Sequence, residues 1–398
     1  MVYCMFNIDK HYVFSSKHGD FMAIYFDCNA TTPMEPEVFE AMHTFFIEEY
    51  GNPGSRTHEY GNRAKKSVET ARREIAAALG LKIGERVVFT SGATESNNLA
   101  LFGLENYAKK TQKNRIIISS IEHKAILEPA AALEKRGFDV VKLRVNSNGQ
   151  VDLDHLQDSL NEKTFLVSIM HVNNETSVIQ PIPQICEILQ NSQAFFHTDS
   201  AQGFGKEISM LTNPRIDMVS VSGHKLYGPK GIGALILRRR GFDKIPLTPI
   251  ILGGGQEDGY RAGTLAVPLI VGLGKAVSIA FRDHDKREKI CHETRKQVLS
   301  FIERIGGVIN GDLQNMVSSG INFSIPGVDS EAAMLALKDV IAVSNGSACT
   351  SQDYTPSHVL TAMGLDNNRV KGALRFSWSH LTPAVDWDLA FSNLKKLL

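Results

Sequence analysis

Short apolar segments alternate with helical segments through residues 86–237, and this alternation limits the folds that the chain can adopt. We predict strands over 86–90, 115–119, 140–144, 165–170, 194–197, 217–221 and 233–237. Apolar strands that alternate with helices form a mostly parallel sheet that is covered on both faces. The pattern therefore predicts an α/β fold, in which ligands gather at the carboxyl ends of the strands.

The pattern changes after residue 264, where a long helical stretch is followed by strands scattered among helices. Further helices are predicted over 35–50, 64–78, 95–108, 125–136, 182–190, 264–283 and 384–397, and further strands over 320–325, 340–343 and 373–377. We infer an N-terminal extension (1–21), a large domain (22–264) and a small α+β domain (265–398). The strand near residue 24 is a candidate to join the small domain.

Composition limits the functional classes. The 398 residues carry no formal net charge, so we expect no direct binding of nucleic acid or of an acidic membrane surface. No apolar stretch reaches the ~18 residues of a membrane span, and residues 1–21 lack the order of a signal peptide. Five scattered cysteines without metal-site spacing predict reduced thiols and a cytoplasmic protein. The basic run Arg238-Arg-Arg240 is interpreted as a solvated strand end.

A lysine follows the strand at 217–221, in the sequence Ser222-Gly-His-Lys225. On position alone, such a lysine is more often a solvated surface residue. Here two hydrogen-bonding side chains precede it and a glycine-rich turn follows, which suits an amine held for covalent chemistry. A lysine amine forms a Schiff base with pyridoxal phosphate, whose ring nitrogen needs an acid and whose phosphate needs a cradle.

Other polar loops follow the predicted strands and can supply these groups. The stretch Ser91-Gly-Ala93-Thr94 lies at a helix start, where free amides and the helix dipole suit a phosphate. Asp199 follows an apolar strand and can pair with the ring nitrogen. The alternatives are a plain N-cap by Thr94 and a helix-capping Asp199. Each signal is weak alone, but together they predict a cofactor site at one sheet edge.

Four further residues carry candidate chemistry. His123 can stack on a cofactor ring and shuttle protons, although a lone histidine is more often structural. Asn174 can bind the cofactor or a substrate carboxylate, which Arg375 can clamp with two hydrogen bonds. Cys349 lies among small residues, where its thiolate can act as a nucleophile, although most such cysteines are inert. No metal site is predicted.

These motifs together resemble the cysteine desulfurases, from Tyr25-Phe-Asp-Cys-Asn-Ala-Thr-Thr-Pro33 to Arg375-Phe-Ser377. The loop Gly346-Ser-Ala-Cys-Thr-Ser351 is similar to that of the group with a long cysteine loop. Within the family, Asn52-Pro-Gly-Ser-Arg-Thr-His-Glu-Tyr-Gly61 and Ser357-His-Val-Leu-Thr-Ala-Met-Gly364 resemble the desulfurases of DNA phosphorothioate modification. A housekeeping sulfur donor for iron–sulfur clusters or tRNA thiolation is the alternative.

The resemblance implies a type I fold of pyridoxal-phosphate-dependent transferases, with a seven-stranded sheet and a small α+β domain. It implies a homodimer that converts L-cysteine to L-alanine and passes sulfur, as a persulfide on Cys349, to an acceptor protein. The implied site comprises Lys225 on the cofactor, Asp199 at the ring nitrogen, His123 against the ring, Gln202 at the ring oxygen, Ala93, Thr94, Ser222 and His224 around the phosphate, Thr264 reaching the neighbouring subunit's phosphate, and Asn174 and Arg375 at the substrate. The rivals are another enzyme of this fold, such as an aminotransferase or selenocysteine lyase, and a non-catalytic sulfur carrier or scaffold.

Overall fold

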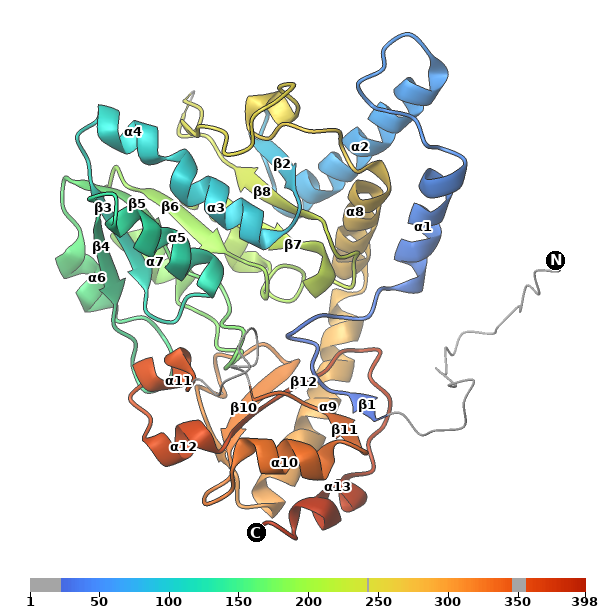
Figure 1. Cartoon of the computed structure of the whole chain (residues 1–398), viewed down its shortest axis with the longest axis vertical. Helices are drawn as coiled ribbons and strands as arrows, with labels where there is room; N and C mark the ends of the chain where they lie inside the picture. Colours follow the sequence, from blue (N-terminus) through green and yellow to red (C-terminus); the bar gives the residue numbers. More distant parts are fainter. Residues whose placement is uncertain (1–22, 242, 346–355) are drawn as a thin grey trace, which may run out of the picture.

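A seven-stranded sheet, the large sheet, forms the upper part of the molecule (Figure 1) in the computed structural model, which describes residues 23–241, 243–345 and 356–398. Its spatial order is β2 (Arg86–Thr90), β8 (Gly233–Leu237), β7 (Met218–Ser222), β6 (Phe195–Asp199), β5 (Thr164–Ser168), β3 (Arg115–Ser119) and β4 (Asp139–Leu143). β8 is antiparallel to both of its neighbours, and the other neighbouring pairs are parallel. The predicted α/β fold with a mostly parallel sheet is confirmed.

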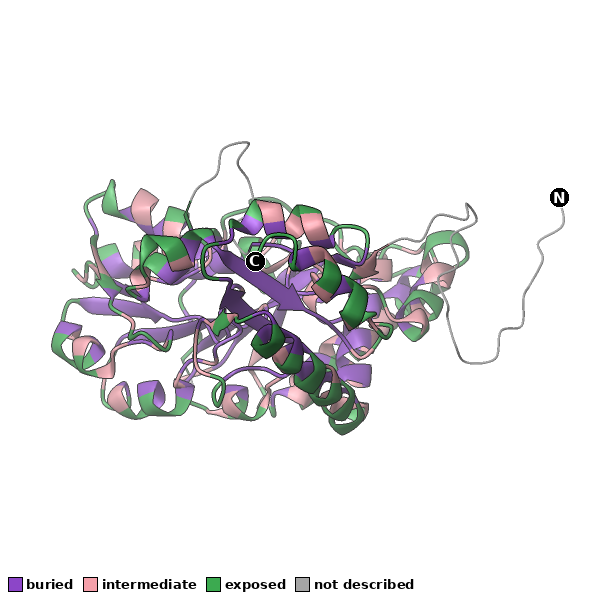
Figure 2. Cartoon of the chain, turned by 90° about the horizontal axis from the view of Figure 1, so that it is seen from below, coloured by how far each residue is buried: buried purple, intermediate pink, exposed green. Residues whose placement is uncertain are grey.

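Helices cover both faces of the large sheet because alternate side chains of each strand point to opposite faces. Val87 and Phe89 of β2 belong to one apolar core, and Val88 belongs to the other. The first core is covered by α1 (Pro36–Ile47), α2 (Glu59–Ala78), α6 (Leu153–Ser159), α7 (Ile182–Ile188) and α8 (Val267–Arg282). The second is covered by α3 (Ala93–Gly103), α4 (Glu105–Lys110) and α5 (Lys124–Glu134). Figure 2 shows buried strands between helices with exposed outer faces.

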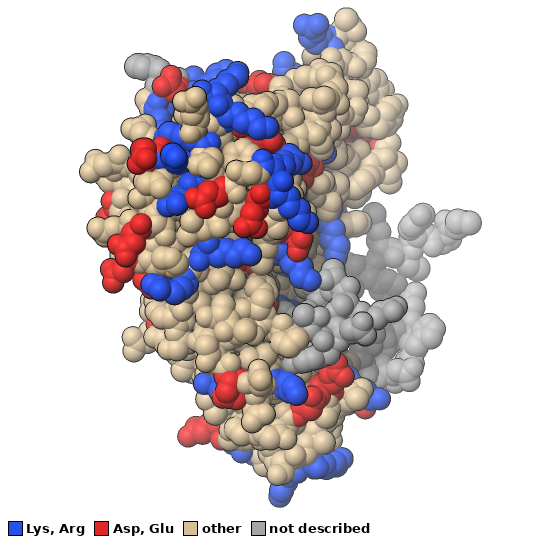
Figure 3. All heavy atoms as spheres, turned by 60° about the vertical axis from the view of Figure 1, so that its left-hand side comes forward, with Lys and Arg blue, Asp and Glu red and all other residues tan. Residues whose placement is uncertain are grey.

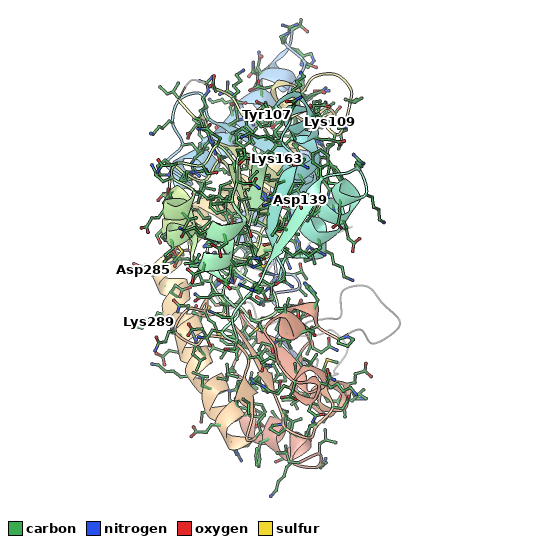
Figure 4. All side chains as sticks on the ribbon, turned by 90° about the vertical axis from the view of Figure 1, so that its left-hand side faces the viewer. Tyr107, Lys109, Asp139, Lys163, Asp285 and Lys289 are labelled. Atoms are coloured by element: carbon green, nitrogen blue, oxygen red, sulfur yellow. The ribbon has the colours of Figure 1, made fainter. Side chains whose placement is uncertain are left out.

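A three-stranded antiparallel sheet, the small sheet, has the order β12 (Ala373–Ser377), β10 (Gly320–Ser324) and β9 (Val308–Ile309). Around it lie α9 (His284–Arg304), α10 (Ser330–Leu337), α11 (His358–Ala362), α12 (Asn367–Lys371) and α13 (Trp387–Leu394). α9 runs from the large sheet toward the small sheet, with Asp285 and Lys289 near its start (Figures 1 and 4). Trp378 and Phe376 are fully buried in this part's apolar core.

The chain crosses between the two parts at its described N-terminal end. β1 (Ile24–Tyr25) pairs in parallel with β11 (Ile341–Ala342), and Phe26 lies in the core beside the small sheet. Conversely, α8 packs with α1 and α2 over the large sheet, although the sequence analysis counted residues 265–283 with the small domain. Residues 27–32 then run from the small part to the edge of the large sheet, where Thr32 exchanges hydrogen bonds with the turn after β7.

Some predicted helix boundaries are wrong, and local contacts explain two of them. α2 begins at Glu59 because His58 Nδ1 accepts a hydrogen bond from the backbone amide of Gly61, a cap that apolar spacing does not show. The single helix predicted over 95–108 is two helices, α3 and α4. The carbonyl of Gly103 accepts a hydrogen bond from the amide of Thr248 in a distant loop (2.8 Å). This bond takes the place of one from the next helical turn, and α3 ends at Gly103.

Candidate active site

One cavity of about 540 Å³ lies at the edge of the large sheet where the strands β2, β3, β5, β6 and β7 end. Parallel strands present their carboxyl ends at one edge, so the loops that follow them converge there. The predicted residues that line this cavity are Ala93, Thr94, His123, Asn174, Asp199, Gln202, Ser222, His224, Lys225 and Arg375. Arg375 comes from β12 of the small sheet, so the cavity lies between the two parts.

Lys225 ends a 3₁₀ turn, Gly223–Lys225, directly after β7. Its Nζ donates hydrogen bonds to the backbone oxygens of Asn29 and Ala30, the latter at 2.8 Å. Tyr227, two residues later, has a φ of 59° and a buried ring. A left-handed conformation is unusual for a bulky residue and requires support from its surroundings. The contacts with residues 29–32 therefore fix both the turn and the amine.

Asp199, at the end of β6, is buried and accepts hydrogen bonds on both carboxyl oxygens. Asn97 Nδ2 donates to its Oδ2 (2.6 Å), and the amide of Ala201 donates to its Oδ1 (2.9 Å). The second bond closes a turn, and no helix begins within residues 200–208, all of which are described, so Asp199 is not a helix cap. Each carboxyl oxygen accepts one hydrogen bond, which leaves the carboxylate able to pair with a charged group in the cavity.

The start of α3 presents a rim of backbone amides that have no acceptor within the helix. Gly92 occupies the N-cap position with a φ of 151° and no side-chain cap, so Thr94 is not the N-cap. A Cβ on Gly233 would lie 2.7 Å from the Cα of Gly92, so glycine at 233 lets β8 approach this turn. The amides and the positive end of the helix dipole suit a phosphate group.

His224 and His123 line the cavity, and both are neutral near pH 7. Burial, followed by the charges of Lys225 and Lys230, lowers the pKa of His224 to about 4. Burial also lowers the pKa of His123. His123 caps α5 by accepting a hydrogen bond from the amide of Ala125 on Nδ1 (3.1 Å). The proton of the neutral ring is therefore on Nε2.

Glu122 is fully buried beside His123. Its Oε1 accepts hydrogen bonds from Ser119 Oγ (2.5 Å) and from the amide of Met170 (2.8 Å), which ties the ends of β3 and β5 together. Its Oε2 has no hydrogen-bond partner among the described residues. Burial raises its pKa to about 8 despite these two bonds, so the carboxyl group is mostly protonated at neutral pH.

Arg375 is 3% exposed and has a carboxylate partner within the chain. Its Nη2 donates to Asp27 Oδ1 (2.5 Å), and its Nη1 donates to the backbone oxygen of Asn174 (3.1 Å). A contact to Ser344 Oγ (3.3 Å) joins it to the chain that leads toward Cys349. Cys349 itself lies outside the described residues.

Thr264 is the predicted residue that lies away from this cavity. It lines a separate hollow of about 390 Å³ together with Arg72 and Glu257. Arg72 forms two hydrogen bonds to the Glu257 carboxylate, at 3.0 and 2.8 Å, and these hold the segment that leads to Thr264. Within this chain, Thr264 therefore does not contribute to the cavity around Lys225.

From the sequence we predicted no functional role for Asn97, Glu122 or Asp27. Asn97 lies one turn inside α3, where an inward-facing polar side chain is the only sequence signal. Glu122 directly precedes the predicted residue His123, but a charged residue is not expected to be fully buried. Asp27 is separated from Arg375 by 348 positions, so neither spacing nor periodicity relates them.

The polar groups of the cavity fit pyridoxal phosphate. It offers an amine at Lys225, a carboxylate at Asp199 and the amide rim of α3. Asn97 Oδ1 and Gln202 Oε1 are buried and have no hydrogen-bond partner among the described residues, so a polar ligand can satisfy them. The described residues contain no cluster of three or more potential metal ligands. Nor does any helix there combine the length and apolarity of a membrane span.

Comparison with known proteins identifies the family. The class-V aminotransferase model matches residues 24–388. The cysteine desulfurase IscS of Rickettsia bellii (strain OSU 85-389) is 44% identical over 371 residues, 93% of this chain and 89% of the relative. A NifS-like protein superposes with a TM-score of 0.85 at 36% identity, covering 94% of this chain and 98% of the other. DndA from Streptomyces lividans superposes with a TM-score of 0.79 at 45% identity, covering 89% and 99%. The chain therefore belongs to the class-V aminotransferase family and, within it, to the pyridoxal-phosphate-dependent cysteine desulfurases.

Proposed function

We propose that the cavity binds L-cysteine, that the Cys349 thiolate removes its sulfur, and that Lys225, His123 and Arg375 are the other principal residues of the reaction. The observation that carries this proposal is the convergence of Lys225, Asp199, His123 and Arg375 on one cavity. Pyridoxal phosphate, when bound, supplies a carbonyl that condenses with amines and a ring that accepts electrons.

The chain's own residues orient these groups. Arg375 and Asn174 bind the α-carboxylate of L-cysteine. When the cofactor is bound, Asp199 would hold its ring and Gln202 its ring oxygen, and its phosphate would be held by Ala93, Thr94, Ser222 and His224. The Lys225 amine takes the α-proton, and neutral His123 is available as a proton donor and acceptor against the ring.

The sulfur step uses Cys349 as a nucleophile. Its thiolate attacks the substrate sulfur, an S–S bond forms, and the Cβ–S bond breaks with its electron pair on carbon. A proton then completes L-alanine, and the sulfur stays on Cys349 as a persulfide. Cys349 follows Asn345 by four residues, which span at most about 14 Å. Ser344 contacts Arg375, so this span begins at the substrate site.

We also propose that the protein is a homodimer. Large apolar side chains are exposed on α1 and on the chain that leads into α2, among them Phe46, Ile47 and Tyr50. A second exposed apolar stretch, residues 250–252, precedes the segment that ends at Thr264. Contiguous exposed apolar surface marks interaction sites. An interface there would explain how Thr264, which lies away from its own cavity, reaches the cofactor phosphate of the neighbouring subunit.

The acceptor is proposed to be a protein of DNA phosphorothioate modification. The similarity to DndA and the motifs at 52–61 and 357–364 support this assignment, whereas the similarity to IscS supports housekeeping sulfur transfer equally well. Lys and Arg are interspersed with Asp and Glu on the face seen in Figure 3, and the chain carries no net charge. We therefore propose transfer to a cytoplasmic acceptor protein, with no direct DNA contact.

The Cys349→Ala variant tests the nucleophile. We expect it to retain bound cofactor and to lose L-alanine release from L-cysteine, while Cys28→Ala, which replaces a buried thiol, keeps both. Normal turnover by Cys349→Ala would contradict the assignment.

Complementation in cells tests the identity of the acceptor. Restoration of DNA phosphorothioation in cells that lack their own desulfurase for it is expected, and rescue of iron–sulfur enzymes alone would favour the housekeeping alternative.

A further inference from the structure

Asp27 forms an ion pair with Arg375, the residue that is proposed to bind the substrate carboxylate. Its Oδ1 accepts a hydrogen bond from Arg375 Nη2 at 2.5 Å, and the two side chains are 21% and 3% exposed. Among the residues that the structure describes, the other acceptors of the guanidinium are neutral, namely the backbone oxygen of Asn174 and the hydroxyl of Ser344. Among these contacts, Asp27 is therefore the charged partner of Arg375.

The backbone fixes Asp27 at this place. Asp27 forms an isolated parallel bridge with Ser377 of β12, two residues beyond Arg375. Residues two apart on a strand share a face, so Arg375 and Ser377 lie on the same side of β12, beside the chain at Asp27. The hydroxyl of Tyr25 donates to the backbone oxygens of Asp27 (2.9 Å) and Thr31 (3.0 Å), which closes the turn between them.

The same turn contacts the reactive amine, because Lys225 Nζ donates to the backbone oxygens of Asn29 and Ala30. One short segment therefore holds Lys225 through its carbonyl groups and Arg375 through a carboxylate. Any α-carboxylate that binds Arg375 places a second negative charge on a guanidinium that already holds one. Two carboxylates on one cation repel each other, most strongly where little water screens them.

We propose that Asp27 is a resident carboxylate that weakens the binding of substrate and product carboxylates to Arg375. The proposal rests on the role of Arg375 in the proposed function. Asp27 acts on a contact that L-cysteine and L-alanine share, so it changes both affinities alike and leaves the chemical step unchanged. Its consequence is faster release of L-alanine, at the cost of a higher KM for L-cysteine.

The test uses the cofactor-loaded protein and its Asp27→Asn variant, which removes the charge and retains an oxygen at Oδ1. Asp388→Asn is the matched control, because Asp388 pairs with Arg304 at 2.6 Å on the exposed surface. Calorimetric titration with L-alanine measures product binding, and initial rates give kcat and KM for L-cysteine. We expect about a tenfold lower dissociation constant and KM in Asp27→Asn, an unchanged kcat, and no change in the control; tenfold is about 1.4 kcal/mol.

Two further variants keep the outcome decisive. Asp27→Ser removes the charge in a smaller side chain, so tighter binding in both variants supports charge competition. Unchanged or weaker L-alanine binding in both would overturn the proposal and would make Asp27 a residue that orients Arg375. Arg375→Lys separates this result from the proposed function. If L-alanine binds Arg375→Lys with the affinity of the parent protein, Arg375 is not the carboxylate site. The proposed role of Arg375 and the role of Asp27 that rests on it then both fail.

Discussion

Replacing Glu122 with Gln should make the protein less sensitive to alkaline pH. The Glu122 carboxyl group is fully buried, and burial raises its pKa from 4.5 to about 8. Between these values the folded state holds a proton that the unfolded state has released. The stability of the folded state therefore falls as pH rises through this range. Gln is neutral at every pH and keeps an oxygen that can accept from Ser119 and Met170.

The size of the effect follows from the shift. A pKa difference of about 3.5 units corresponds to roughly 5 kcal/mol in total, at about 1.36 kcal/mol for each unit. About 3 kcal/mol of this free energy of unfolding is lost between pH 6 and pH 9, as the pH rises through the pKa of Glu122 in the folded state. The described residues offer no hydrogen-bond partner at the position of Glu122 Oε2. The Gln amide group that replaces this oxygen is therefore unpaired, which costs about 1–3 kcal/mol. That cost is the same at each pH, so it cancels when slopes are compared.

Urea unfolding at several pH values between 6 and 9 measures this slope for both proteins, each loaded with cofactor. We expect the free energy of unfolding of the parent protein to fall relative to Glu122→Gln by about 3 kcal/mol across the interval. Glu128→Gln, an exchange at another position near the start of α5, is a control for general effects of removing a carboxylate. Parallel curves for parent and Glu122→Gln would show that Glu122 is already ionised at pH 6, and they would refute the reasoning.

Three other substitutions test the cavity and the core. Asn97→Leu removes one of the two hydrogen bonds to the Asp199 carboxylate, and a loss of about 1.5–3 kcal/mol predicts roughly 10- to 150-fold weaker cofactor binding, measured by absorbance titration. Gly233→Ala places a Cβ against the backbone oxygen of Val221 and 2.7 Å from the Cα of Gly92, so we expect both β7 and the phosphate rim to shift and cofactor to be lost on dialysis, which an unchanged occupancy would contradict. Trp378→Ala empties part of a fully buried core and should cost about 3–5 kcal/mol in denaturant unfolding, with little change in cofactor affinity.

The sequence predicted the strands of the large sheet well because most of them are short apolar runs bounded by polar residues, with β4, which contains Asp139 and Lys142, as an exception. β2 and β3 match their predicted bounds, and β6 is displaced toward Asp199. The pairing of β1 with β11 joins segments more than 300 positions apart, and two-residue strands carry no periodicity. The cap that starts α2 depends on a histidine, which is not a usual capping residue.

Charged residues were the least predictable because their partners are distant in sequence. Arg238 was expected to be solvated, but it is 4% exposed and donates hydrogen bonds to the backbone oxygens of Leu79, Leu211 and Ile216. The prediction of a solvated run is therefore wrong for this residue. Arg238 follows β8, where several carbonyl groups from different segments meet, and burial there becomes possible only once the fold has formed.

In the cavity, too, some positions were predictable from the sequence and others depend on partners that are distant in sequence. The positions of Ala93, His123, Asn174, Asp199 and Lys225 were predictable because each ends or follows a strand whose carboxyl end lies at one edge of the sheet. The hydrogen bond from Asn97 to Asp199 and the ion pair between Asp27 and Arg375 depend on how helices and the small sheet meet that edge. Those contacts set the charges around the site, and sequence spacing does not record them.

The most direct test of the central claim is the intact mass of the cofactor-loaded protein after incubation with L-cysteine, with L-alanine quantified in the same sample. We expect a gain of one sulfur atom per chain, located on the peptide that contains Cys349 and removed by a thiol reductant, and one L-alanine for each sulfur. An unmodified Cys349 in protein that forms L-alanine, or sulfur carried on another cysteine, would contradict the account.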